Sequence, residues 1–238
     1  NLTAYRRMVV IDPIKLTITN WKEDHIEWLD VTFCACYFLW REIFPKEKGT
    51  KLPNLQNNLS LGFRKIPMSR SIYIDHDDFM EFPSNKYFRL SPGASVRLKY
   101  GYIIKCTGFK RIDDKIVEIL CTYDENSLNS KPAGPRIKGT IHWVSDYDCT
   151  WSTVMLYDKL FTNPDISDVD NYCDFINPNS CIIKKCPIEY SLKSASPLEL
   201  YQFERVGYFC VDTHSTSNNL IFNRSIKLNS NWTKILSK

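Results

Sequence analysis

The sequence predicts an all-β protein, and three observations lead to that prediction. Apolar and polar residues alternate over many short runs, which is the period of a β-strand. Turn residues separate these runs at short intervals, and long stretches with the 3.6-residue period of an amphipathic helix are almost absent. At 238 residues, the chain is long enough for two small β domains.

Charge and composition limit the classes of partner. The net charge of +4 and the pI near 8.5 are mildly basic, which is compatible with a local RNA-binding face without requiring one. The aromatic fraction of 13% and the small number of glycines, eight in all, favour a packed and ordered fold.

The cysteines do not form a recognisable framework. There are nine, an odd number, with no CxxC pair, and the chain has only four histidines, His25, His76, His142 and His214. We therefore expect no zinc site. No signal-peptide pattern opens the sequence, so we expect reduced and mostly buried thiols in a cytoplasmic protein.

The amino-terminal residues predict two strands. The first runs from Met8 to Ile11 and is stopped by Asp12-Pro13; the second runs from Ile14 to Thr19 and alternates cleanly. The chain begins without methionine, which we interpret as a piece of something longer. Arg6 and Arg7 are consistent with a solvated basic pair.

Residues 22–50 have no assigned role. Within them, Val31–Trp40 is a run of ten uncharged residues rich in aromatic side chains. Such a run is too short to cross a bilayer, which takes about twenty apolar residues. We treat 22–50 as an insertion of unknown role.

The acidic run Asp75-His76-Asp77-Asp78 resembles a metal-binding loop only superficially. Neither the glycine nor the distal glutamate of a calcium loop follows in register. We therefore expect a solvated turn that caps the segment at Phe79.

A basic hairpin is predicted next. Tyr87–Leu90 forms the first arm, Ser91-Pro92-Gly93 the turn, and Ser95–Cys106 the second arm. Alternation places Arg97, Lys99 and Lys105 on one face of that arm, opposite Val96, Leu98, Tyr100, Tyr102 and Ile104. Three cations beside aromatic side chains suit contacts with phosphates and bases, although a solvated outer face is an equally good explanation.

Further elements follow in order. Ile116–Tyr123 is a strand turned back by Asp113-Asp114, and Thr140–Val144 is another strand, whose His142 we interpret as structural. A short helix is expected near Val169–Phe175, and Phe222–Leu228 is the last strand.

The stretch Leu200–Asp212 predicts a strand pair with Tyr201 and Phe203 on one face. Gly207 marks a bulge or a close backbone approach. Gln202 and Arg205 point to opposite faces unless a bend brings them to one edge, where an amide and a guanidinium can read a base. On pattern alone, Arg205 paired with a carboxylate is the better interpretation.

Three segments carry a resemblance to a known family. Tyr201-Gln202-Phe203-Glu204-Arg205 with Gly207-Tyr208-Phe209, Lys138–Ser145, and Val9–Pro13 resemble the carboxy-terminal anticodon-binding region of glutaminyl-tRNA synthetase, in order and from residue 4 to about 228. The resemblance implies two antiparallel β-barrels in tandem, like those of the ribosomal L25 family, with little helix. It assigns residues 1–21 and 150–238 to a first (proximal) barrel and 51–149 to a second (distal) barrel.

The same resemblance implies the residues that bind RNA. Positions matching Arg6, Gln202 and Arg205 contact the middle anticodon base, Arg89 faces the third base, and Arg97 and Lys99 face the first. Lys86 and Asn57 complete the expected RNA-binding set. Lys99 stands where an arginine is expected, and lysine lacks the bidentate fork, so looser reading of the first base is expected.

Catalysis is expected to lie outside this chain. Pro67-Met68-Ser69-Arg70-Ser71 resembles the Lys-Met-Ser-Lys-Ser loop of class I synthetases, but the first lysine is missing and the motif falls inside the anticodon region. A His-Ile-Gly-His motif is also absent from the sequence. We expect this part to be non-catalytic and to need no cofactor or metal, with ATP and magnesium implied for the full-length ligase.

The resemblance also implies the partners. These are the anticodon loop of glutamine tRNA and the catalytic domain of the same polypeptide, with no role for DNA or a membrane. Two alternatives remain: the anticodon-binding domain of a glutamyl-tRNA synthetase, and a structural RNA-binding module like the ribosomal L25 family.

Overall fold

The chain is built from β-strands, as the sequence predicts. A computed structural model describes residues 4–30, 52–55, 58–128, 130, 137–165 and 171–228. Within these ranges there are sixteen strands and four short 3₁₀ helices, and no α-helix. None of the described helices is long and apolar enough to cross a membrane.

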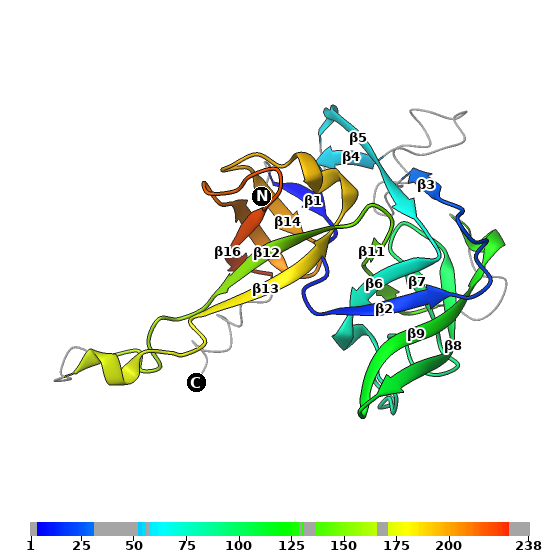
Figure 1. The fold of residues 1–238 in the computed structure, drawn as a ribbon, viewed down its shortest axis with the longest axis horizontal. Helices are drawn as coiled ribbons and strands as arrows, with labels where there is room; N and C mark the ends of the chain where they lie inside the picture. Colours follow the sequence, from blue (N-terminus) through cyan, green and yellow to red (C-terminus); the bar gives the residue numbers. More distant parts are fainter. Residues whose placement is uncertain are drawn as a thin grey trace.

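The first barrel is a six-stranded sheet, which we call the proximal barrel (Figure 1). Its ends meet where Val9 bridges Ile188, with Glu189 N–H donating to Met8 O at 3.0 Å and Val10 N–H donating to Pro187 O at 3.3 Å. These bonds pair the edge strands and remove the open sheet edge. In spatial order the strands are β1 (Tyr5–Arg7), β14 (Leu200–Phe203), β15 (Gly207–Val211), β16 (Ile221–Lys227), β12 (Thr150–Tyr157) and β13 (Cys181–Ile188).

The second barrel is a seven-stranded sheet, the distal barrel, which forms the neighbouring lobe in Figure 1. Its two outer strands, β10 and β11, are consecutive in the chain and separated only by His142, so this segment spans the seam of the sheet. In spatial order the strands are β10 (Thr140–Ile141), β7 (Ser95–Leu98), β8 (Ile103–Ile112), β9 (Lys115–Asp124), β2 (Pro13–Ile18), β6 (Ser71–Asp75) and β11 (Trp143–Ser145).

A third, three-stranded sheet lies over the junction, with β5 (Asn58–Met68) between β3 (Glu27–Asp30) and β4 (Leu52–Leu55). Leu29, Ile66 and Met68 of this sheet are buried in the core of the distal barrel. The 3₁₀ helices are η1 (His76–Asp78), η2 (Glu125–Ser127), η3 (Tyr172–Phe175) and η4 (Tyr190–Ser194).

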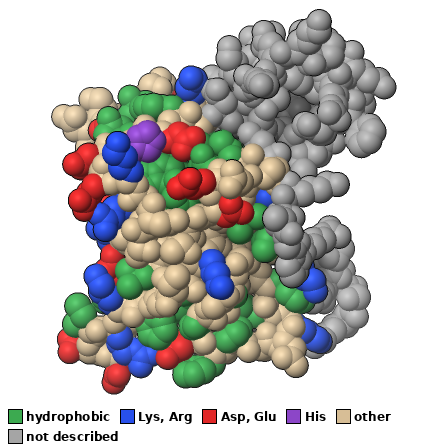
Figure 2. Space-filling model, turned by 90° about the vertical axis from the view of Figure 1, so that its right-hand side faces the viewer, with side chains coloured by type: hydrophobic (Ala, Val, Ile, Leu, Met, Phe, Trp, Pro, Cys, Tyr) green, Lys and Arg blue, Asp and Glu red, His purple; other side chains and the backbone are tan. Residues whose placement is uncertain are grey.

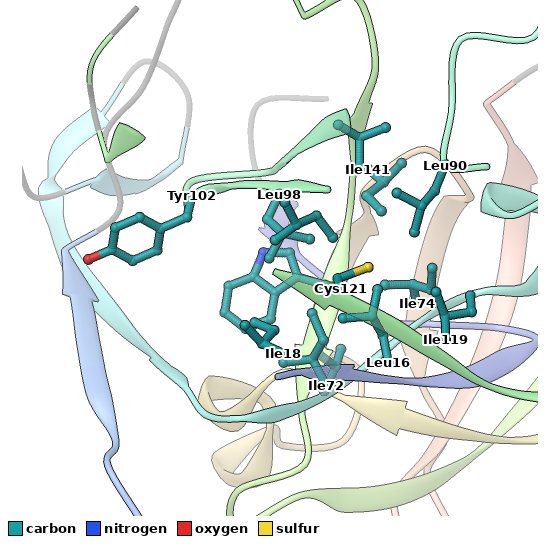
Figure 3. Close-up of a cluster of buried hydrophobic side chains, with 14 of the residues drawn as sticks. Leu16, Ile18, Ile72, Ile74, Leu90, Leu98, Tyr102, Ile119, Cys121 and Ile141 are labelled. Carbon is teal, nitrogen blue, oxygen red and sulfur yellow. The ribbon is translucent and has the colours of Figure 1, made fainter. Parts of the chain in front are cut away.

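Each barrel has its own hydrophobic core. In the distal barrel, side chains from β2, β6, β7 and β9 point into a common interior (Figure 3). Three consecutive residues link the two cores: Met8 and Val10 pack in the distal core, and Val9 packs in the proximal core. Because extended backbone points successive side chains in opposite directions, this segment anchors both barrels at once.

Several predicted elements are confirmed. Leu200–Asp212 forms the β14–β15 pair, and Ile14, Leu16 and Ile18 of β2 are buried. The Asp113-Asp114 turn joins β8 to β9, with both residues at positive φ (47° and 60°). The expected short helix is present as η3.

The placement of the second amino-terminal strand was wrong. We expected residues 1–21 to belong to the proximal barrel, but β2 pairs with β6 and β9 in the distal barrel, and only β1 joins the proximal sheet. Part of the expected 22–50 insertion is β3, which pairs with β5. Val31–Trp40 lies outside the described residues.

The basic hairpin also differs from the prediction. Tyr87–Leu90 is not a strand, and Ser95–Cys106 is not one arm but two, β7 and β8. The chain reverses at Tyr100, whose φ of 65° is left-handed, and Gly101 N–H donates to Leu98 O at 2.9 Å. Aromatic residues in this turn continued the apolar alternation and concealed the reversal.

The seven cysteines that the structure describes are all unbridged. Cys106 and Cys121 face each other across β8 and β9 and are buried in the distal core, and Cys186 is buried in the proximal core. The expectation of mostly buried thiols was therefore wrong for this part of the chain, since Cys149, Cys173, Cys181 and Cys210 are half-buried or exposed.

A buried ionic cluster joins the barrels around Glu189, a residue that is only 3% exposed. Its oxygens accept from Arg64 Nε at 2.5 Å, from Met8 N–H at 2.9 Å and from the Ser191 hydroxyl at 2.6 Å. Arg7 lies 3.9 Å away and is buried, so the expectation that it is solvated was wrong. Burial alone would raise the pKa of Glu189, but Arg64 and Arg7 hold that pKa below its usual value.

Replacing Glu189 by Gln should destabilise the fold by about 3–5 kcal/mol, because the buried Arg64 and Arg7 would lose their counter-charge. Urea denaturation at pH 7 measures the change. Glu23→Gln is the matched control, since Glu23 forms an exposed pair with Arg70 and its loss should leave stability nearly unchanged.

The same pair of variants has a pH signature. With a lowered pKa in the folded state, Glu189 stabilises the protein above the usual carboxyl value of 4.5, and that contribution is lost as the pH falls below it. The stability gap between wild type and Glu189→Gln should therefore narrow below pH 4.5. A gap that widens on acidification would contradict this account.

Gly139 lies where a side chain cannot fit. A Cβ at this position would lie 2.0 Å from the carbonyl oxygen of Phe88, whereas a Cβ on Gly108 would meet nothing within 4 Å. Gly139→Ala should therefore cost about 1–3 kcal/mol of stability, with Gly108→Ala as the nearly neutral control. Thermal unfolding of both variants measures the difference, and equal effects would contradict the close approach.

Candidate nucleic-acid interface

The two barrels meet at a depression of about 420 Å³. Its polar lining combines donors and acceptors from both barrels: Asp75, Asp77, Arg89 and His142 from the distal side, and Arg205 from the proximal side. Two arginines that are 116 residues apart in sequence, Arg89 and Arg205, are thus brought to one cavity by the packing of the barrels.

Asp78 organises both arginines from beneath. Its side chain is fully buried, and its two oxygens accept from Nη1 and Nη2 of Arg205, each at 2.7 Å. The Arg89 Nη1 lies 3.1 Å from the same carboxylate and also donates to Asp77 O at 3.1 Å. The expectation of a solvated acidic turn was therefore wrong for Asp78, which is a buried counter-ion.

The turn after β14 aims Arg205 at the depression. Arg205 has a left-handed φ of 68°, and Val206 N–H donates to Phe203 O at 3.0 Å, which closes the turn. Gly207 follows because a Cβ there would lie 2.4 Å from Ile226 O, which confirms the predicted close approach. Burial alone would lower the pKa of Arg205, but Asp78 raises it above the usual value, so the guanidinium stays charged.

His142 contacts Arg205 from the seam of the distal barrel. It is 2% exposed, with Nδ1 3.2 Å from Arg205 Nη1 and Nε2 3.0 Å from Val9 O. Burial and the neighbouring Arg205 lower the pKa of His142 to about 4, so the ring is neutral at pH 7.

Arg6 and Gln202 form a second pair. They are direct partners in the parallel β1–β14 register, and Arg6 Nε donates to Gln202 Oε1 at 3.1 Å. This bond occupies the carbonyl of the amide and leaves its NH₂ group as a donor.

Lys99 is neutralised by a buried acid of the other barrel. Its Nζ lies 2.7 Å from Glu204, which also accepts from the Tyr100 hydroxyl at 2.8 Å. Glu204 is 5% exposed, so the pair ties the β7–β8 turn to the residue that precedes Arg205.

Two family models match this chain. Both are described as the anticodon-binding domain of class I (E and Q) tRNA synthetases, and they cover residues 41–124 and 140–212, together more than half of the chain. The chain belongs to this anticodon-binding domain family.

Relatives agree with that assignment. The chain is 40% identical to a glutamine–tRNA ligase of Rhodopirellula baltica over 100% of this chain and 37% of that protein. It is 39% and 37% identical to the glutamine–tRNA ligases of Proteus mirabilis and Vibrio campbellii, over 99% of this chain and 39% of each. The chain therefore spans well under half the length of these relatives.

In this anticodon-binding domain, Arg97 lies apart from the depression. Its guanidinium donates to the carbonyls of Gly101 at 3.2 Å, Ser127 at 2.8 Å and Ser130 at 2.7 Å. These bonds hold the loop that follows β9. The reversal at Tyr100 places Lys105 on β8 and not on the strand of Arg97, but Lys105 pairs with Ser95 and so stays on the outward face that carries Arg97.

One more expected RNA-binding residue, Lys86, lies on the loop between η1 and β7. Lys86 is exposed there, and the Phe88 ring is 51% exposed, with Lys138 Nζ 4.6 Å from its centre. Asn57 lies outside the described residues.

The segment that resembles the catalytic loop is structural in this domain. Met68 ends β5 inside the core, and the Ser69 hydroxyl bonds Ser71 O at 2.6 Å and the Ser145 hydroxyl at 2.8 Å. Among the described residues, no group of three or more His, Cys, Asp or Glu side chains is placed to hold a metal ion.

Sequence patterns missed two residues that shape the site of this domain. Asp78 was grouped with its solvated neighbours, and His142 was given no specific partner. The pairing of each with Arg205 spans 127 and 63 residues respectively, so local alternation carried no signal for it.

Asp78→Asn should release both arginines of the depression. An amide has one accepting oxygen where the carboxylate has two, so it cannot accept both bonds from Arg205, and the substitution also removes the buried negative charge that neutralises Arg89 and Arg205. We expect a loss of about 3–5 kcal/mol in stability, measured by urea denaturation. Asp77→Asn is the matched control, since Asp77 is exposed and contacts Arg89 through its backbone carbonyl. Equal stability of the two variants would contradict the central role of Asp78.

Proposed function

We propose that this chain reads the anticodon of glutamine tRNA as the anticodon-binding part of a glutamine–tRNA ligase. The observation that carries the proposal is the depression between the barrels, in which Asp78 presents Arg89 and Arg205 beside the carboxylates of Asp75 and Asp77. The relatives described above are all glutamine–tRNA ligases, which supports the choice of tRNA.

The chemistry of the depression suits bases rather than a uniform backbone. Unstacked loop bases present both donors and acceptors on their edges, and arginine forks and carboxylates can bind those edges in pairs. Figure 2 shows acidic and basic side chains interspersed on the visible face of the distal lobe. With a net charge of only +4, recognition by local contacts is favoured over attraction by a broad positive field.

Each expected RNA-binding residue has a proposed role. Arg6, Gln202 and Arg205 read the middle uracil, Arg89 reads the third base, a guanine, and Lys86 and Asn57 add further contacts. Arg97 and Lys99 face the first base. Lys99 is bound to Glu204 and lacks the planar fork of an arginine. Both features support less specific recognition of the first anticodon base, so that either cytosine or uracil can be accepted.

The activity belongs to the whole ligase. A class I catalytic domain of the same polypeptide would use ATP and magnesium to attach glutamine, in the cytoplasm, while the present chain selects the tRNA. The structural role of Pro67–Ser71 supports a non-catalytic part, because Met68 is buried in the core and the Ser69 hydroxyl bonds within the fold.

A glutamyl-tRNA synthetase is the second candidate. The family description covers both the glutamate and the glutamine enzymes, whose tRNAs differ at the third anticodon base. A structural RNA-binding module is less well supported, because the relatives match across the whole chain.

Arg89→Ala should abolish discrimination at the third anticodon base. An arginine bidentate to guanine is worth about 1–3 kcal/mol, so the wild-type chain should bind a glutamine anticodon hairpin about tenfold or more tightly than one with that guanine changed to cytosine. Titration at fixed salt measures both affinities. Arg70→Ala is the matched control, because Arg70 is a surface arginine paired with Glu23.

Three outcomes are informative. Discrimination in wild type and Arg70→Ala but not in Arg89→Ala supports the proposal. Equal binding of both hairpins by wild type would overturn it. Tighter binding of the cytosine hairpin would place the chain with the glutamyl enzymes.

A further inference from the structure

The contacts of Arg205 leave one edge of its guanidinium available. Of its five N–H donors, one on Nη1 and one on Nη2 bind the carboxylate of Asp78 at 2.7 Å each, and the second Nη1 hydrogen faces His142 Nδ1 at 3.2 Å. Within the part of the chain that the structure describes, no acceptor is recorded for Nε–H and the second Nη2–H. These two donors project in parallel from one edge and form a fork.

His142 can fill its position in one tautomer only. Because Arg205 can only donate, Nδ1 must be the accepting nitrogen, and Nε2–H must donate to Val9 O at 3.0 Å. The residue is 2% exposed and lies between β10 and β11, so its ring is enclosed by the fold. Burial and Arg205 lower the pKa of His142 to about 4, which keeps Nδ1 unprotonated at pH 7.

We propose that His142 is a positioning residue for base reading: it accepts one Nη1–H of Arg205 so that only the Nε/Nη2 fork remains to donate to the middle anticodon uracil. The inference rests on the proposed function. Asp78 fixes the plane and direction of the guanidinium, and His142 closes its second edge. Without His142, the unpaired Nη1–H could contact either uracil or cytosine through a bridging water. Discrimination between these two bases would then fall.

Two substitutions separate the two bonds of His142. In His142→Asn, Oδ1 occupies the place of Nδ1 and can still accept from Arg205, but the bond to Val9 O is lost. In His142→Gln, Nε2 can still donate to Val9 O, but the acceptor for Arg205 is lost. A purely structural role predicts that the more stable variant also reads the base better.

The experiment measures thermal stability and hairpin affinity of the full 238-residue chain for wild type and both variants. The probes are a glutamine anticodon hairpin and the same hairpin with the middle uracil changed to cytosine, at fixed salt. Wild type and His142→Asn should prefer the uracil hairpin about tenfold or more, whereas His142→Gln should lose most of that preference while unfolding at a higher temperature than His142→Asn. His214→Gln is the control and should match wild type, because His214 is exposed and does not line the depression.

Each other outcome overturns the inference. Unchanged preference in His142→Gln would show that the acceptor is unnecessary. Equal loss of affinity for both hairpins would mean that the fork binds a phosphate instead of a base. Equal loss of preference in both variants would make His142 a structural residue. Absence of any preference in wild type would overturn the proposed function as well, which separates the two failures.

Discussion

The relation between the two barrels depends on three buried carboxylates, each bonded to a cation at the junction. Glu189 binds Arg64, Glu204 binds Lys99, and Asp78 binds Arg205. An ion removed from water costs several kcal/mol unless it is paired and hydrogen-bonded, so separating the barrels would leave these charges uncompensated. The ionic pairs therefore specify one docked arrangement, in addition to the apolar contacts of Met8, Val9 and Val10 with both cores.

This arrangement has a direct consequence for recognition. An arginine side chain loses about 1.5–2 kcal/mol of conformational freedom when it is ordered. In the free protein, Asp78 already holds Arg205 by two bonds and Arg89 by one, so that cost is met during folding and not on binding. The same carboxylate that stabilises the junction thus prepares the two arginines for a ligand.

The basic residues expected from the resemblance divide by environment rather than by charge. Arg89 and Arg205 line a depression beside acids that can accept from a base, whereas Arg97 donates to three backbone carbonyls and Lys99 is matched by Glu204. A cation whose hydrogen-bond donors are already bound to protein acceptors contributes to the electrostatic potential and shape of the RNA-binding surface more than it forms new bonds to RNA. The depression between the barrels is therefore the centre of the proposed specificity, and the β7–β8 turn is its support.

The sequence by itself determined the all-β class, the β14–β15 pair and the inward face of β2, because strand alternation and turn chemistry are local properties of the chain. The resemblance supplied the candidate arginines. Only the tertiary structure decided that β2 lies in the distal barrel, that Asp78 is buried beneath Arg205, and that Arg6 meets Gln202. The last two contacts join residues 127 and 196 positions apart. Asp78 meets Arg205 only when the two barrels dock, and Arg6 meets Gln202 only when β1 pairs with β14, which no local pattern encodes.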